Sequence, residues 1–380
     1  MNLWLNFFSV TPQFSFYIFA TMNFKPTVSQ VNYLNIGLML VAAVCAFFRP
    51  FETFLFAYAF LGPAHYLTEI SWLHDRNYFT KGKYDFLFLL TAGLIITAAN
   101  FKLIPNLPDG ASTIIIFVAF FGSLVFVLVK NVVARIGLLL GIALVSKLFI
   151  TSTIFDSVFG TFMPTLIHVF IFTGLFILVG AMKSRSFSGI LSLVVFVGTA
   201  IALFYVPISG QHAPTKYVFD SYGHLQPDGK SFTDGFIGLH YSIIRIFNLH
   251  EFGNPEMTLS QFVDSFNNYI YQNPLSLAIM AFIAFAYTYH YLNWFSKTSV
   301  IQWHNIPRAR FIGIITLWLL SIGLYWYDYA VGLQWLFLLS FTHVLLEFPL
   351  NQLTFINIGK EIGGIFTGKK PGGSKPAKAN

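Results

Sequence analysis

Long runs of apolar residues alternate with short polar segments over most of the chain. A helix rises about 1.5 Å per residue, so crossing the hydrocarbon core of a bilayer takes roughly 20 mostly apolar residues. The runs that meet this requirement, the first of them short, are residues 33–48, 51–73, 84–100, 110–128, 131–151, 155–181, 187–206, 275–296, 309–326 and 329–350. The pattern predicts an all-α fold: a polytopic integral membrane helical bundle with about ten transmembrane helices and a small extramembrane insertion.

The spacing of these runs divides the chain into four parts. Residues 1–206 are expected to form an N-terminal transmembrane region of about seven helices, and residues 275–350 a C-terminal one of about three. Residues 207–274 begin with a segment rich in Gly, Pro, Asp and Ser and continue with two amphipathic helical segments. They predict an extracytoplasmic domain of loops, short strands and helices. Residues 351–380 end in a basic, Gly- and Pro-rich sequence and are expected to form a cytoplasmic tail.

Composition also indicates a membrane protein. The 380 residues are 56% hydrophobic and 10% charged, with a mean hydropathy of +0.68, whereas soluble domains carry about 25% charged residues. So few charges cannot cover the surface of a water-soluble protein of this size. Residues 1–24 are uncharged, but a proline and several polar residues interrupt them, so we expect them to lie at the membrane surface rather than to span it.

Basic residues gather in alternate connections between the predicted spans. Short loops rich in Lys and Arg face the cytoplasm, and placing the basic C-terminal tail inside puts the other basic loops inside as well. Those loops contain Arg76, Lys81, Lys83, Lys130, Arg135, Lys183, Arg185, Lys297, Arg308 and Arg310. We therefore expect both termini in the cytoplasm and the protein in a bacterial inner (cytoplasmic) membrane. The net charge of +7 reports this topology and does not indicate binding to nucleic acid.

Four histidines interrupt the apolar spans at a common depth. His65, His168, His290 and His343 each lie about 13–15 residues from the predicted outer end of a helix that runs inward, or roughly 20 Å below the outer boundary. Two of them are followed by a carboxylate at i+4, His65 by Glu69 and His343 by Glu347, and this spacing places both side chains on one helix face. Ionisable groups inside a span are costly, which makes these residues candidates for a functional site.

Imidazole and carboxylate ligands suit zinc, iron or manganese. The chain has one cysteine, Cys45, so a multi-cysteine metal site is excluded. We expect non-haem iron bound by the four histidines, with Glu69 and Glu347 as catalytic residues that orient the ligands or complete the shell. Zinc, or haem b between two axial histidines, remains an alternative. A further alternative is that each histidine only donates a hydrogen bond to a neighbouring helix.

Polar residues outside this set have plainer interpretations. Tyr287 and Asn293 flank His290 on the same helix face and are candidates for hydrogen bonds to the site. Four further histidines occur between the two transmembrane regions without the spacing of metal ligands, and we expect ordinary surface residues at these positions, which are His212, His224, His240 and His250.

Three short motifs around these histidines are similar to a known family. GPAHYLTE resembles the G-x-P-H-x-x-x-D element of the Brp/Blh family of bacterial and archaeal membrane β-carotene dioxygenases, THVLLEFPL resembles its C-terminal Pro-His element, and YTYHYLNWF its late H-x-x-x-H element. The resemblance implies an all-helical membrane protein that holds one iron through His65, His290 and His343, with His168 a candidate fourth ligand. Here Trp294 replaces the second histidine of the late element, and the acidic partners are Glu rather than Asp.

Together these features predict an integral-membrane, iron-dependent oxygenase or hydroxylase that uses dioxygen on a lipid-soluble substrate such as a carotenoid or another isoprenoid. The 46 Phe residues suit contact with lipid and an apolar substrate. The alternative is a membrane transporter or channel in which the His and Glu side chains bind protons or cations. A third is a structural partner whose polar layer joins helices.

Overall fold

The computed structural model describes residues 26–104, 108, 110–206, 214–233, 235–252, 256–297, 302 and 305–367. The segment expected at the membrane surface, residues 1–24, lies outside the described residues. So do His212 and the basic end of the tail beyond residue 367.

The described chain is helical, and its only β-type pairing is an isolated bridge between Leu225 and Phe232. Its helices are α2 (Val28–Phe48), α3 (Pro50–Phe56), η1 (Ala57–Leu61), α4 (Gly62–His74), η2 (Asn77–Phe79), α5 (Asp85–Asn100), α6 (Ala111–Leu128), α7 (Val132–Ser146), α8 (Thr153–Phe155), η3 (Asp156–Phe172), α9 (Thr173–Ser184), α10 (Phe187–Tyr205), α11 (Lys216–Tyr222), α12 (Ile237–Ile246), α13 (Leu259–Gln272), α14 (Pro274–Ser296), α16 (Arg308–Tyr327) and α17 (Tyr329–Phe366). The predicted all-α fold is confirmed.

Each predicted span contains helix. Seven helical segments are long and apolar enough to cross a membrane, namely Val28–Phe48, Ala111–Leu128, Thr153–Ser184, Phe187–Tyr205, Pro274–Ser296, Arg308–Tyr327 and Tyr329–Gly364. Two more apolar helices, α5 and α7, are shorter. The remaining predicted span, 51–73, is divided into α3, the π-helix η1 and α4.

Three boundaries differ from the sequence-based expectation. α17 does not end near residue 350 but continues to Phe366, and its added turns bury Asn351 and Gln352. α7 ends at Ser146, several residues before the predicted limit. Residues 207–274, expected to begin as loop or short strands, contain the helix α11 before the expected amphipathic helices α12 and α13.

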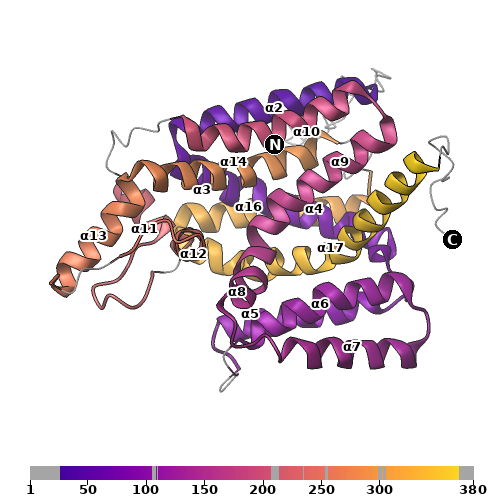
Figure 1. Cartoon of the computed structure of the whole chain (residues 1–380), viewed down its shortest axis with the longest axis horizontal. Helices are drawn as coiled ribbons and strands as arrows, with labels where there is room; N and C mark the ends of the chain where they lie inside the picture. The colour runs from indigo at the N-terminus through magenta and orange to yellow at the C-terminus, as the bar shows by residue number, and fades with distance from the viewer. Residues whose placement is uncertain are drawn as a thin grey trace, which may run out of the picture.

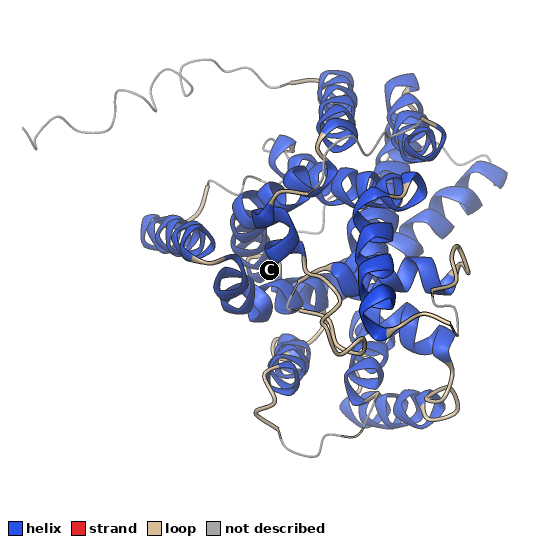
Figure 2. Ribbon diagram, turned by 90° about the vertical axis from the view of Figure 1, so that its left-hand side faces the viewer, coloured by secondary structure: helices blue, strands red, loops and turns tan. Residues whose placement is uncertain are grey.

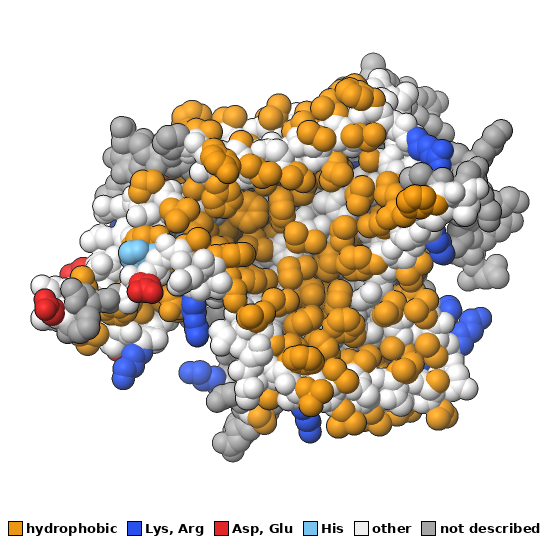
Figure 3. All heavy atoms as spheres, in the orientation of Figure 1, with side chains coloured by type: hydrophobic (Ala, Val, Ile, Leu, Met, Phe, Trp, Pro, Cys, Tyr) orange, Lys and Arg blue, Asp and Glu red, His pale blue; other side chains and the backbone are white. Residues whose placement is uncertain are grey.

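Two central helices organise the bundle. α14 is the most buried of the candidate spans and packs against α2, α3 and α10, while α17 packs against α4, α5, α6 and α16. Figures 1 and 2 show the remaining long helices arranged around this pair, with α11, α12 and α13 at one end. In Figure 3 hydrophobic side chains cover the middle of the visible face and Lys and Arg lie toward its edges, as expected for a surface in contact with a lipid bilayer.

Prolines occur close to candidate site residues in three helical segments, and π-helical turns accompany two of them. Pro63 follows the π-helix η1 and precedes His65, Pro164 lies within the π-helix η3 before His168, and Pro349 lies within α17 after His343. Proline lacks a backbone donor and clashes with the preceding turn, so the ordinary i to i−4 ladder cannot continue through it. π-helical turns are rare and occur frequently at functional sites.

A buried histidine joins α11 and α12 to α14 through hydrogen bonds. Ser276 of α14 donates to the Ile270 carbonyl (2.7 Å), and its oxygen lies 3.0 Å from Nε2 of His240 in α12. The Tyr222 hydroxyl of α11 lies 3.3 Å from Nδ1 of the same ring. Nε2 therefore donates to Ser276 and Nδ1 accepts from Tyr222, which requires a neutral imidazole. The expectation that His240 is a surface residue was wrong, because this residue is fully buried.

The other two described histidines of this region differ from each other. His224 is half-buried and stacks on Phe219, whereas His250 is exposed.

Acid is expected to weaken the fold through His240. Burial lowers the pKa of this ring to about 3, whereas an unfolded histidine titrates near about 6.5. Between these values the unfolded chain binds the extra proton, so the stability due to neutral His240 is complete above about pH 6.5 and is lost as pH falls toward about 3. Thermal unfolding in detergent should show a smaller loss of melting temperature between pH 7 and pH 4.5 in His240→Gln than in the parent protein.

His250→Gln is the matched control, because its ring is exposed in the same region. Equal acid sensitivity in the parent protein and in both variants would contradict this role of His240.

Candidate metal centre

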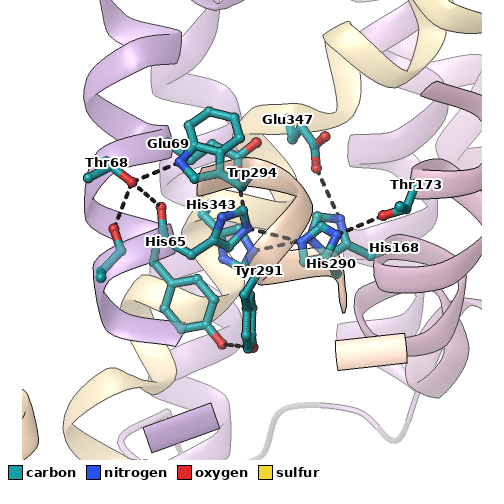
Figure 4. Close-up of polar contacts among 12 residues, drawn as sticks. His65, Thr68, Glu69, His168, Thr173, His290, Tyr291, Trp294, His343 and Glu347 are labelled. Carbon is teal, nitrogen blue, oxygen red and sulfur yellow. Dashed lines mark hydrogen bonds and ion pairs between the residues drawn. The ribbon is translucent and has the colours of Figure 1, made fainter. Parts of the chain in front are cut away.

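Four helices bring the four predicted histidines to one point inside the bundle. His65 comes from α4, His168 from η3, His290 from α14 and His343 from α17, and all four side chains are buried. Figure 4 shows the rings facing one another. The apolar residues around them belong to two separate buried clusters, which meet at the histidines. The four histidines, which the sequence places at a common depth, therefore also lie close together in space.

The imidazole nitrogens approach closely in pairs. Nε2 of His65 lies 3.0 Å from Nε2 of His290, and Nε2 of His168 lies 3.2 Å from Nε2 of His343. The ring centroids of His168 and His290 are 4.9 Å apart, and those of His65 and His343 5.5 Å. The Nε2 atoms therefore form two close pairs that lie next to each other.

The outward nitrogens of three rings have their own partners. Nδ1 of His290 lies 2.8 Å from the Thr173 hydroxyl, and Nδ1 of His343 lies 3.3 Å from the Leu339 carbonyl oxygen. Nδ1 of His168 lies 3.1 Å from Oε2 of Glu347. Metal-binding histidines typically present their second nitrogen to a carboxylate or carbonyl in this way, because that partner fixes the tautomer and the ring orientation.

The two carboxylates occupy different positions. Glu69 places Oε2 3.0 Å from Nε2 of His65, on the side where the four nitrogens converge, and it also lies within reach of His343. Glu347 was expected to accompany His343, its i−4 neighbour, but its Oε2 instead lies beside the outer nitrogen of His168 on another helix. Glu69 is therefore placed to contact a bound ion directly, and Glu347 to orient a ligand.

The donor set fits a metal ion. Two sets of three residues each place their ligand atoms within 4.8 Å of one another, namely His65 with His168 and His290, and His65 with Glu69 and His343. Ligands about 2.0–2.1 Å from one zinc ion, at angles between 90° and 109°, lie about 2.8–3.4 Å apart, and the nitrogen pairs fall within this range.

Some buried polar atoms around the histidines have no hydrogen-bond partner among the described residues. Oε2 of Glu69 is buried and has no hydrogen bond among the described residues, although it lies 3.0 Å from Nε2 of His65. Nδ1 of His65 has no partner there either. Leaving a carboxylate oxygen unpaired in an apolar interior costs free energy, which a positive ion beside Glu69 would offset.

Several contacts around the histidines were not foreseen from the sequence. Trp294, which replaces the second histidine of the late motif, packs its ring 5.3 Å from that of His65 and donates from Nε1 to the Thr68 hydroxyl (3.0 Å). Tyr66 stacks on His343 with ring centroids 4.2 Å apart. Thr68 lies one turn after His65, and this spacing was the only signal that could have marked it.

The predicted hydrogen bonds from Tyr287 and Asn293 to the site are not formed. Asn293 instead accepts from the Tyr289 hydroxyl (3.4 Å), and Tyr287 lines a cavity beside the histidines. Thr173 takes the position that we expected one of these residues to fill.

That cavity has a volume of about 210 Å³ and reaches His168 and His343. Tyrosines line much of it, and Gly235, Phe236 and Leu239, next to and within α12, close one side. The segment around α12 therefore contributes directly to the surroundings of the histidines.

No family model, curated protein or solved structure matches the chain. The resemblance of its motifs to the Brp/Blh family stays a prediction.

Removing the Glu347 carboxylate should weaken metal binding without abolishing it. Partners of this kind typically change metal affinity 10- to 100-fold, so Glu347→Ala is expected to bind zinc about 10- to 100-fold more weakly in competition with a chromophoric chelator. Glu361→Ala, on the same helix and away from the histidines, is the control and should bind like the parent protein. Unchanged affinity in Glu347→Ala would contradict the role assigned to this residue.

Proposed function

We propose that the protein is an integral-membrane, metal-dependent oxygenase or hydroxylase that uses non-haem iron and acts on a lipid-soluble substrate such as a carotenoid or another isoprenoid. The observation that carries the proposal is the convergence of the four buried imidazoles, three of which have a polar group beside the outward nitrogen. Imidazole and carboxylate without thiolate are a donor set that iron accepts, and zinc is the competing ion.

Each residue of the site has a distinct role in this proposal. His65, His168, His290 and His343 hold the ion, and Glu69 completes its surroundings on the same side. Thr173, the Leu339 carbonyl and Glu347 keep three of the rings in position. Iron bound by these residues would supply the oxidising chemistry with dioxygen. The catalytic role predicted for the two glutamates remains part of the proposal.

The surroundings favour an apolar substrate. The rings lie inside a bundle whose face in Figure 3 is largely apolar, and aromatic side chains line much of the adjacent cavity. Dioxygen and apolar molecules both concentrate in lipid, so both reactants would reach the site from the membrane. A dry interior also strengthens the electrostatic contacts between the protein and an ion.

One observation favours the alternative function in transport. His343, Glu347 and Asn351 follow one another at intervals of four residues on α17. The Asn351 side chain is buried, and neither of its polar atoms has a hydrogen-bond partner among the described residues. A row of polar groups along one helix face is a feature of proton and cation pathways.

Metal content and spectrum test the proposal. Protein purified in detergent is expected to contain about one iron per chain with no Soret band, and His65→Ala should lose it because His65 belongs to both groups of candidate ligands. His74→Ala, an exposed histidine at the end of the same helix, is the control. Dioxygen uptake in proteoliposomes should then depend on an added isoprenoid and on His65.

A Soret band would show that the protein binds haem and would contradict the proposal of non-haem iron. A folded, metal-free protein that moves protons or cations across liposomes would overturn the oxygenase proposal in favour of transport.

A further inference from the structure

The cavity beside the histidines contains more hydroxyl groups than an apolar hydrocarbon would need. Tyr58, Tyr66, Tyr287, Tyr291 and Ser340 all line it. The four tyrosines are almost completely buried. Burying a hydroxyl without a hydrogen bond costs free energy, so the partners of these groups indicate what the cavity binds.

A count of hydroxyl hydrogens shows that donors are left over. Tyr58 donates to the Ser340 oxygen (3.2 Å), and the hydroxyls of Tyr66 and Tyr291 share one hydrogen bond (2.9 Å). Four hydroxyl groups carry four hydrogens, and these two bonds use two of them. Joining the two pairs through Tyr58 and Tyr66 would use a third, and the described residues form no further hydrogen bond that uses the fourth.

Tyr287 adds a further donor. It lies one helical turn before Tyr291 on α14, so both side chains project from the same face of that helix. Its hydroxyl forms no hydrogen bond with the described residues, although its ring packs against Phe54 and Tyr58. The cavity thus offers at least two unused donors.

The cavity offers few acceptors in return. Its remaining lining is mostly apolar, and its two histidines already place their Nε2 atoms toward each other at 3.2 Å. Dispersion and burial alone would hold a pure hydrocarbon, but such a ligand would leave the tyrosine hydrogens unpaired. A ligand oxygen would satisfy them.

From this imbalance we propose that the cavity binds the oxygen-bearing end of an apolar molecule, a carbonyl, ether or hydroxyl oxygen that accepts from the tyrosine hydroxyls, beside His168 and His343. The inference rests on the proposed function and narrows its substrate class: oxygenated isoprenoids are preferred over hydrocarbons of the same skeleton. Tyr66 carries one of the hydroxyls and also stacks on His343, so the ligand oxygen would lie close to the proposed metal site.

The size of the cavity fits one ring with short substituents. A cavity of about 150 Å³ accommodates benzene, and this cavity measures about 210 Å³. Phe337 and Phe341 also line a neighbouring cleft of about 590 Å³. A longer molecule can therefore place a ring-sized end beside the histidines and continue past these two phenylalanines.

Carvone and limonene form a suitable pair of probes, because they share a ring skeleton and differ in one carbonyl oxygen. Binding of each is measured by equilibrium dialysis against the full chain in lipid nanodiscs, with empty nanodiscs to correct for partition into lipid. We expect carvone to bind at least about fivefold more tightly than limonene, as one hydrogen bond allows. Tyr66→Phe and Tyr291→Phe should each weaken carvone binding about three- to tenfold and leave limonene binding unchanged.

Tyr325→Phe is the matched control, because this buried tyrosine lies outside the cavity lining and should leave both affinities unchanged. Equal binding of the two probes, no binding of either, or equal losses for both probes in the two variants would overturn the inference. If one variant fails to fold, as judged by its melting temperature, the other decides.

The probe experiment tests this inference separately from the proposed function. Carvone selectivity in a protein without metal would retain the inference and reject the oxygenase, whereas stoichiometric iron without carvone selectivity would do the reverse.

Discussion

Polar groups inside a lipid-embedded bundle have no water to bind, so each must find a partner within the protein. This constraint explains the arrangement of α4, η3, α14 and α17. Each contributes one imidazole to the centre, and a hydroxyl, a carbonyl and a carboxylate fix the outer side of three of the rings. The inner nitrogens are left facing one another in pairs, where either a hydrogen bond between two imidazoles or a bound positive ion can satisfy them. The contacts of the four imidazoles therefore help to fix the relative positions of the four helices.

Two features of the surrounding structure support the arrangement of the four histidines. Prolines before His65 and His168 interrupt the regular helical ladder, and π-helical turns adjoin or contain these positions. At the other end, the buried contacts of His240 hold α12 against α14, where residues in and next to α12 close the cavity beside the histidines. The segment around α12 therefore helps to enclose the site.

The sequence predicted the helices well, because composition and run length are sufficient to recognise spans in lipid. It also predicted the convergence of the four histidines, because helical rise converts position along a span into depth. It did not predict the partners across helices. The i, i+4 rule pairs Glu347 with His343 on one helix, whereas helix packing turns Glu347 toward His168. Thr173 and the burial of His240 depend on the same packing, which no local pattern encodes.

X-ray absorption spectroscopy of the metal-loaded protein tests the central claim most directly, because imidazole rings produce characteristic multiple scattering around the absorbing ion. The account predicts a first shell at about 2.0–2.1 Å dominated by three or four imidazole nitrogens, with the imidazole signal reduced in His168→Ala and in His343→Ala alike. A shell made only of oxygen, or an imidazole signal unaffected by both substitutions, would contradict it.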